Sequence, residues 1–220
     1  MGAATTILSL WIAFAVTHMT FSSVRLRPRL VSALGDRAFL GIYSLIALIL
    51  FVPMVSVYFG NKHAGPLLWF LGGSPAVRWL GYGGMGTSLA LLVGGLLRPS
   101  PASMMPGKAQ VAGAFRITRH PVFMAAGLFG LVHLVMTPVN AAELAFFGGF
   151  PVFAVLGSWH QDQRKLQTAG EAFRNFEAGT PFLPFSGADR LRGLGEMRWA
   201  LVLGIGLAVL LRMFHRSLFG

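Results

Sequence analysis

Long apolar stretches alternate with short polar segments along the whole chain. A helix that crosses a lipid bilayer needs about 20 mostly apolar residues. Stretches that reach or approach this length occupy residues 3–24, 38–59, 77–97, 121–136, 141–159 and 199–211. The fourth and sixth are short, so tilt or local thinning of the bilayer would have to accommodate them. The pattern predicts an all-α fold, a polytopic membrane helical bundle of about six transmembrane helices.

The polar segments between these stretches differ in charge. Of the 18 Lys and Arg residues, 14 follow the first, third and fifth stretches, in segments 25–37, 98–119 and 164–198. Basic loops stay on the cytoplasmic side of membrane proteins. We therefore expect a multi-pass protein of the bacterial inner (cytoplasmic) membrane with both termini in the periplasm. No basic region precedes the first stretch, which favours a retained span over a cleaved signal peptide.

One integral membrane domain is expected over residues 1–220, with segment 160–198 lying at the cytoplasmic interface. Within that segment, residues 162–176 predict a short amphipathic helix on the membrane surface. The sequence Thr-Pro-Phe-Leu-Pro-Phe at 180–185 then ends it and returns the chain to the bilayer. Pro99, Pro101 and Pro106 predict an extended loop after the third span.

Composition excludes several classes of protein. The chain is 55% hydrophobic and only 11% charged, too few charges for a soluble globular domain or a disordered chain. The net charge of +11 is explained by the basic loops, which would contact anionic membrane lipids, so no nucleic-acid partner is expected. The absence of cysteine excludes disulfides, thiolate catalysis, zinc–thiolate sites and iron–sulfur clusters.

Two histidines, His18 and His133, fall inside predicted spans, where ionisable side chains are costly and often functional. Neutral imidazole is a good ligand for iron, copper or zinc in an apolar setting, and haem is the natural cofactor when cysteine is absent. An interhelical hydrogen bond is the open alternative for each histidine. His18 lies about 10 Å and His133 about 20 Å from the cytoplasmic boundary, so a shared iron requires tilted helices or a tilted haem.

Small residues share the helical face of His133, namely Gly130 and Ala126, while Phe14 and Trp11 share that of His18. They could admit and cover a flat macrocycle. The alternative is that small residues simply let helices pack closely. The glycine-rich run at 81–86 resembles a dinucleotide motif, but no strand precedes it, so close helix packing is the better interpretation.

The sequence Arg119-His120-Pro121 lies where the third basic segment meets the fourth span. Together with Arg116, these side chains could bind an anion at the helix start, such as a haem propionate or a phosphate. A plain cytoplasmic anchor is the alternative. His120 and His133 lie on nearly opposite faces of one helix, so they cannot share a metal.

Other titratable residues suggest lesser roles. His160 and Asp162 flank the end of the fifth span and could form a proton relay or an interfacial cap. Glu143 suits the start of that span, because helix N-termini favour acids. His63 and His215 are expected to be solvated.

The chain resembles the NnrU family and its relatives, the zeta-carotene isomerases, from His18 to about Phe185. Three groups of short stretches carry the resemblance. The first is His18 with the run at 30–45, Leu-Val-Ser-Ala-Leu-Gly-Asp-Arg-Ala-Phe-Leu-Gly-Ile-Tyr-Ser-Leu. The second is Arg116-Ile117-Thr118-Arg119-His120-Pro121 with Leu131-Val132-His133. The third is Asp162-Gln163-Arg164-Lys165-Leu166 with Gly170-Glu171-Ala172-Phe173 and the run at 180–185.

The resemblance implies a haem b protein that isomerises a cis double bond of a polyene taken from the bilayer, such as 15-cis-zeta-carotene. His18 and His133 match the haem-ligand histidines of the isomerases and would be the metal-binding and catalytic residues. His120 matches the histidine of the Arg-His-Pro motif, so Arg116, Arg119 and His120 would be further cofactor-binding residues. NnrU proteins are associated with denitrification, which implies a haem-binding accessory or sensor in nitrogen-oxide metabolism as an alternative.

A more distant resemblance is to isoprenylcysteine carboxyl methyltransferases, which share Arg-His-Pro and a late Gly-Glu and Leu-Pro-Phe segment. It implies a third function, a membrane methyltransferase that uses S-adenosylmethionine. Phe123 stands where those enzymes typically have tyrosine, and Gln161 replaces the first of two adjacent acids, leaving Asp162. Both differences weigh against a methyl-donor site.

Overall fold

The computed structural model describes residues 2–98 and 110–219, and nearly all of them are helical. The prolines at 99, 101 and 106, predicted to form an extended loop, lie outside these residues. In chain order the helices are α1 (Ala3–Phe21), α2 (Leu26–Leu34), α3 (Asp36–Asn61), α4 (Pro75–Leu97), α5 (Ala114–Ile117), α6 (Pro121–Met136), α7 (Ala141–Ala169), α8 (Glu171–Ala178), α9 (Arg190–Glu196) and α10 (Arg198–Phe219).

The structure confirms the all-helical membrane fold. Five helices, α1, α3, α4, α7 and α10, are long and apolar enough to cross a bilayer. The sixth predicted span, α6, begins and ends at the predicted residues but has only 16. At 1.5 Å per residue it measures roughly 24 Å, less than the ~30 Å of a hydrocarbon core. The chain is therefore a multi-pass membrane protein with one short apolar helix inside the bundle.

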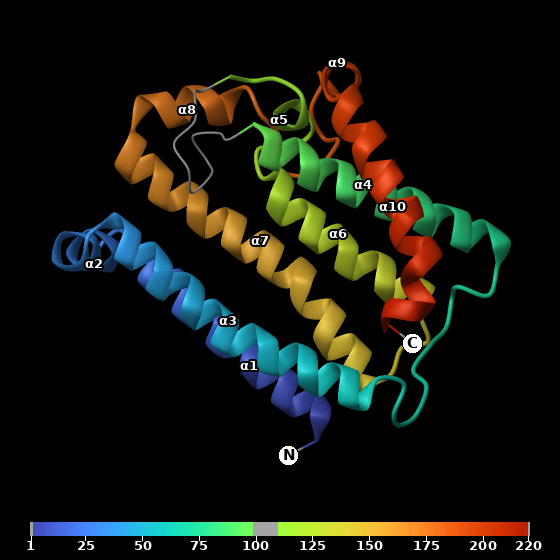
Figure 1. Cartoon of the computed structure of the whole chain (residues 1–220). Coiled ribbons are helices and arrows are strands. Elements are labelled where there is room, and N and C mark those ends of the chain that lie inside the picture. Colours follow the sequence, from blue (N-terminus) through green and yellow to red (C-terminus); the bar gives the residue numbers. More distant parts are fainter. Residues whose placement is uncertain (1, 99–109, 220) are drawn as a thin grey trace.

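Helix α7 runs through the middle of the molecule, with α1 and α3 on one side and α6, α4 and α10 on the other (Figure 1). It packs against both α1 and α6. Among the described residues, no Cα atom of α1 lies within 8 Å of a Cα atom of α6. A site that used residues of both α1 and α6 would therefore have α7 between its two parts.

The described parts of the three basic segments lie at one end of the bundle, called here the basic end. Ser22, after α1, lies 3.1 Å from the His160 ring on α7, and Arg119, before α6, bonds Asp162 on α7. At the opposite, far end, the segments before α4 and before α7 pair through an isolated antiparallel bridge between Trp69 and Val139. The predicted grouping of the basic segments is confirmed in space; the compartment that they face stays a prediction.

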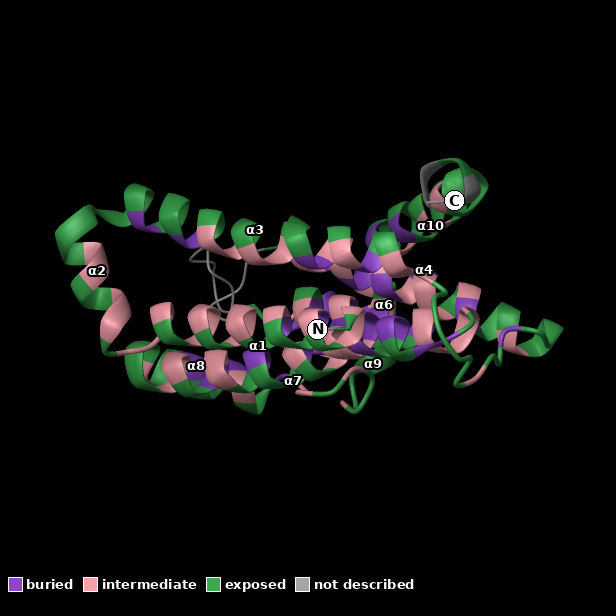
Figure 2. Ribbon diagram, turned by 90° about the horizontal axis from the view of Figure 1, so that it is seen from below, coloured by how far each residue is buried: buried purple, intermediate pink, exposed green. Residues whose placement is uncertain are grey.

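The outer surface of the bundle is apolar. On α3, for example, Leu45, Leu48, Ile49 and Val52 are each more than half exposed, and their spacing places them on one stripe of the helix. Figure 2 shows most of α3 exposed or half-buried. Buried residues are more frequent along α6 and the two helices that pack against it, α4 and α7. A stripe of this kind is stable against lipid tails and costly in water.

Local sequence explains where α7 begins and ends. Asn140 and Glu143 form a capping box at its start, in which each side chain bonds the other residue's backbone N–H. This confirms the predicted place of Glu143. At the other end, Gly170 has φ of +55°, a conformation that glycine adopts without strain, and it separates α7 from α8.

The predicted amphipathic helix at 162–176 is wrong in its bounds. Residues up to Ala169 continue α7, and only α8 is a separate short helix. The prediction failed because backbone hydrogen bonding carries a helix beyond the point where its sequence becomes polar. As a result Asp162 lies inside α7 and is buried, with 3% of its surface exposed.

Glycines let neighbouring helices approach closely. A Cβ atom at Gly204 of α10 would overlap the backbone of Ala90 in α4, and one at Gly130 of α6 would overlap the Phe147 carbonyl of α7. In the glycine-rich run, Cβ atoms at Gly81 and Gly84 would meet side chains of α6. The close-packing interpretation of that run is confirmed.

We expect Gly204→Ala to separate α10 from α4 and to cost about 1–3 kcal/mol of stability, the usual cost of overpacking a close contact. Gly206→Ala on the same helix is the matched control, because nothing lies within 4 Å of its added Cβ. Thermal unfolding of both variants in detergent measures the difference. Equal midpoints for the two variants would contradict this packing.

Candidate functional site

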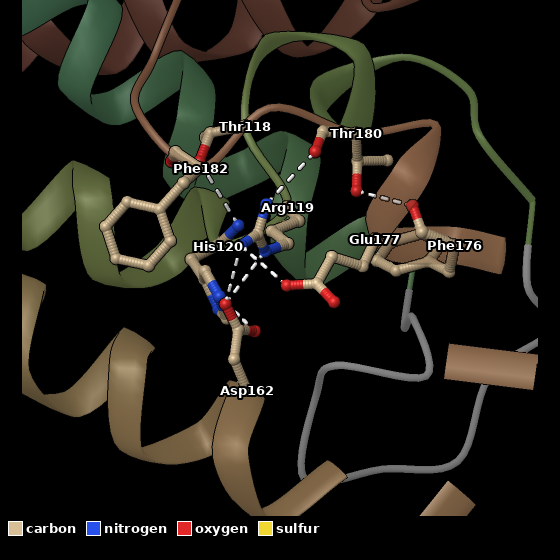
Figure 3. Close-up of polar contacts among 8 residues, drawn as sticks. All are labelled: Thr118, Arg119, His120, Asp162, Phe176, Glu177, Thr180 and Phe182. Carbon is tan, nitrogen blue, oxygen red and sulfur yellow. Dashed lines mark hydrogen bonds and ion pairs between the residues drawn. The ribbon is translucent and has the colours of Figure 1, made fainter. Parts of the chain in front are cut away.

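A buried polar cluster lies at the basic end, where α6 begins (Figure 3). Helix α5 ends at Ile117, the chain is extended through Thr118, and Pro121 occupies the first turn of α6, where its missing N–H is not needed. This geometry turns His120 toward α7. Its side chain is 1% exposed, and its Nε2 lies 2.7 Å from Asp162 Oδ1.

The His120–Asp162 contact determines which nitrogen of the His120 imidazole carries a hydrogen. A carboxylate oxygen accepts, so Nε2 must carry the hydrogen and donate it to Asp162. Phe123 and Phe182 surround the His120 ring, with centroids 6.3 and 5.6 Å away in edge-on orientation. The imidazole is held in one orientation by a charged partner in an apolar setting, where such a bond is strong.

Arg119 completes the cluster and uses its whole guanidinium group. Nε and Nη2 each lie 2.8 Å from Asp162 Oδ2, Nη2 is 3.1 Å from Glu177 Oε1, and Nη1 donates to the Thr180 carbonyl at 3.1 Å. The guanidinium carbon lies 5.1 Å from the centre of the Phe182 ring. Both oxygens of Asp162 are thus occupied, one by His120 and one by Arg119.

Backbone bonds join the same residues to segment 180–185. Arg119 N donates to the Pro181 carbonyl at 2.8 Å, and Thr118 Oγ1 donates to the Phe182 carbonyl at 2.6 Å. Three stretches that are separate in the sequence therefore meet at one place: the Arg-His-Pro motif, Asp162 and the run at 180–185.

The third predicted anion ligand, Arg116, is also paired inside the protein. Its Nη1 lies 2.8 Å from Asp189 and its Nε 3.0 Å from Glu196. The Gly113 N–H donates to Glu196 at 2.8 Å and, as the largest influence, lowers the pKa of that carboxyl. The role of Arg116, Arg119 and His120 toward a haem propionate or another anion stays a prediction, and in this arrangement their donors bind internal acids and carbonyls.

The imidazole of His18 lies near the basic end of α1, in an aromatic environment. Its ring centroid is 4.6 Å from Tyr43, 5.2 Å from Phe14 and 5.4 Å from Phe153. Tyr43 donates its hydroxyl to the His18 backbone carbonyl at 3.3 Å. Three helices, α1, α3 and α7, therefore enclose this ring.

His133 lies near the far end of α6, stacked on Phe147 with centroids 4.4 Å apart and beside Phe129 at 4.2 Å. Its Nδ1 is 2.8 Å from the Phe129 carbonyl, which can only accept. Nδ1 therefore carries the hydrogen, and Nε2 keeps its lone pair. An imidazole fixed in this tautomer by a carbonyl is the usual arrangement of a metal-ligating histidine.

The structure does not bring His18 and His133 together. They contact α7 at Phe153 and Phe147, six residues or roughly 9 Å apart along the axis, whereas two nitrogens on one iron lie only about 4 Å apart. Between them, the Phe150 ring packs 5.1 Å from Trp11 and 5.3 Å from Phe129.

The helical face that Gly130 shares with His133 is also filled. The backbone and side chains of α7 occupy the space that a larger side chain at position 130 would take. The close-packing interpretation of the small residues on α6 is confirmed at this position. As arranged here, the two imidazoles do not fit the two sides of one haem.

The remaining predicted residues have other partners. The His160 ring bonds the Ser22 hydroxyl at 3.1 Å and does not pair with Asp162. His63, expected to be solvated, is half exposed but lies 3.1 Å from the buried Glu143 carboxylate. His215 is exposed. Within residues 2–98 and 110–219, no three His, Asp or Glu side chains gather as a metal site.

The His120–Asp162 pair was not predicted from the sequence. The composition contained an indication of this pair, because the chain has only 7 acidic residues, Asp162 among them, against 18 basic ones. The methyltransferase resemblance alone grouped Arg119, His120 and Asp162.

Comparison with known proteins gives the family. The NnrU protein family model matches residues 6–220, and the chain belongs to this family. It is also similar to the chloroplastic 15-cis-zeta-carotene isomerases of Zea mays and Arabidopsis thaliana, with 26% identity over 182 and 183 residues. These alignments cover 81% of this chain and 49% of each relative, so the chain spans about half the length of the curated relatives it matches. No solved structure matches it significantly.

We expect Asp162→Ala to be the most damaging substitution in the buried cluster. It leaves Arg119 and His120 without their shared partner, and breaking a buried ion pair from one side costs about 3–5 kcal/mol. Glu177→Gln is the control, because that carboxylate is 31% exposed and bonds only one nitrogen of Arg119. Thermal unfolding in detergent should give a much larger shift for Asp162→Ala; similar shifts would show that the cluster contributes little to stability.

The lowered pKa of Glu196 predicts a loss of stability in acid. The folded-state pKa of Glu196 is below the ordinary 4.5. The carboxylate therefore contributes its full stabilisation above pH 4.5 and loses it as the pH falls through the lower, folded-state pKa. Glu196→Gln should therefore narrow the difference in unfolding temperature between pH 6 and pH 3. An unchanged pH dependence in this variant would contradict the assignment.

Proposed function

We propose that this protein is a membrane isomerase that rotates a cis double bond of a conjugated, lipophilic substrate, with haem b as cofactor. The observation that carries the proposal is the similarity, over four fifths of the chain, to two proteins named 15-cis-zeta-carotene isomerase. We place the protein in the bacterial inner membrane with both termini in the periplasm, on the distribution of its basic segments.

The interior of the bundle supports a hydrocarbon substrate. A continuous set of aromatic rings from α1, α3, α6 and α7 lies between the two half-buried histidines, and neighbouring centroids are 5 to 6.5 Å apart. Its members are Trp11, Phe14, Phe51, Phe129, Phe150 and Phe153. Such rings contact a planar polyene favourably and keep water out. The apolar outer surface gives a substrate dissolved in the bilayer direct access to the helices.

For haem, the two proposed ligands differ in how well this structure suits them. His133 offers an Nε2 lone pair on a ring oriented by the Phe129 carbonyl. His18 is held among rings of three helices, on the other side of α7. His133 and His18 would be the residues that hold haem, and the chemistry it would supply is that of a redox-active iron beside a conjugated double bond. Ligation of one iron by both histidines requires α1 or α6 to shift against α7.

The absorption spectrum of detergent-purified protein, oxidised and dithionite-reduced, tests the cofactor. We expect a Soret band typical of two histidine ligands. His133→Ala and His18→Ala should each lose haem or convert it to a five-coordinate form, while His63→Ala, in the far-end loop, should keep the wild-type spectrum. A colourless folded protein, or a wild-type spectrum in both ligand variants, overturns the haem assignment.

Turnover is tested separately with 15-cis-zeta-carotene under reducing conditions. Conversion to the trans isomer by wild type, and its loss in His133→Ala, supports the proposal. Haem and binding of nitric oxide without conversion refute it in favour of an accessory or sensor in nitrogen-oxide metabolism. A haem-free protein that binds S-adenosylmethionine refutes it in favour of a methyltransferase.

A further inference from the structure

A small cavity lies at the basic end, away from the His120–Asp162 cluster. It has a volume of about 80 Å³ and lies between the connection from α1 to α2 and the last turns of α7. Its polar lining consists of Ser23, Arg27, Arg164, Lys165 and Thr168. Three of these five side chains are cationic.

These three cations lack the acidic partners that Arg116, Arg119 and Arg192 have. Each of those three arginines pairs with Asp or Glu. In contrast, no described Asp or Glu oxygen lies within 4.0 Å of a side-chain nitrogen of the cationic residues in the cavity lining. Arg164 and Lys165 lie within electrostatic reach of Arg27. The cavity therefore concentrates positive charge that the described part of the protein does not neutralise.

Arg164 also has a side-chain N–H that donates no hydrogen bond to a described atom. Its Nε is buried and, among the described atoms, has no hydrogen-bond partner. A buried N–H without an acceptor is costly, and most such groups in folded proteins have a partner. An acceptor in the adjoining cavity would satisfy it.

The walls of the cavity are held in place without a ligand. The guanidinium of Arg27 lies 5.5 Å from the centre of the Phe39 ring, and the Ser22–His160 bond fixes the end of α1 against α7. Ser23 Oγ accepts the Leu26 N–H at 3.2 Å, which leaves its own hydroxyl hydrogen free to donate. The donors from α2 and α7 thus converge from two sides.

We propose that this cavity binds an anionic phosphoryl group, with Arg27, Arg164 and Lys165 as its ligands. A phosphoryl group presents several oxygens in different directions, so it can accept from both walls at once, and arginine is well suited to it. The source of the group is the headgroup of an anionic phospholipid or a soluble phosphate, which share this chemistry. The cavity begins two residues after the end of α1, a candidate membrane span, and basic pockets beside such helix ends bind anionic headgroups.

The test measures binding on delipidated protein in detergent, without haem or turnover as a readout. Unfolding temperature is followed during titration with dioleoyl-phosphatidylglycerol, with dioleoyl-phosphatidylcholine as the zwitterionic comparison. Potassium phosphate, against potassium chloride at equal ionic strength, forms the soluble arm. We expect saturable stabilisation by phosphatidylglycerol. Stabilisation by phosphate alone would identify the soluble source.

Arg164→Gln and Arg27→Gln should each weaken the stabilising anion about tenfold, since hydrogen bonds between charged groups are worth more than one factor of ten in affinity. Arg29→Gln is the matched control, because it removes the same charge from an exposed position of the same helix. Circular dichroism checks that each variant is folded. Absence of saturable binding in both arms, or an equal loss in Arg29→Gln, overturns the proposal.

Discussion

A buried carboxylate in an apolar bundle must be paired, and Asp162 meets this requirement by joining the basic end together. Its two oxygens bind His120 and Arg119, which precede α6, while Asp162 itself belongs to α7. Arg119 then extends the network to Glu177 and to the Thr180 carbonyl. One pairing requirement therefore determines how α6, α7 and the segment after α8 are arranged.

The far end is assembled on the same principle with a different acid. Glu143 is fully buried, and its carboxylate accepts from the Asn140 and His63 backbones. It joins the start of α7 to the loop after α3. Because α7 carries a buried acid near each end, it connects the two polar ends of the molecule while its middle packs against aromatic rings. This accounts for the central place of α7 in the bundle.

Much of the fold could be predicted from the sequence, because hydrophobic length and basic segments are direct physical requirements of a bilayer. The bounds of α6 were predicted, since its apolar stretch runs from residue 121 to 136 and Pro121 suits a first helical turn. The end of α7 was not, because an apolar pattern ends at Trp159 while helical hydrogen bonds continue to Ala169.

The candidate site was harder to predict for a related reason. Which residues pair depends on which helices are neighbours, and no spacing in the sequence states that α7 separates α1 from α6. Gly130 illustrates the ambiguity: a missing side chain leaves space equally for a macrocycle or for a neighbouring helix, and only the packing of α7 distinguishes them.

The position of α1 links the two proposals. His18 is the haem-ligand candidate that has to approach His133, and it lies within electrostatic reach of His160 and Arg164 at the basic end. The same end of α1 leads directly into the cationic cavity through Ser23. Uncompensated charge on α2 and α7 pushes these elements apart, and an anion between them removes that repulsion. An anion in the cavity would therefore reinforce the Ser22–His160 bond, which already holds the basic end of α1, next to His18, against α7.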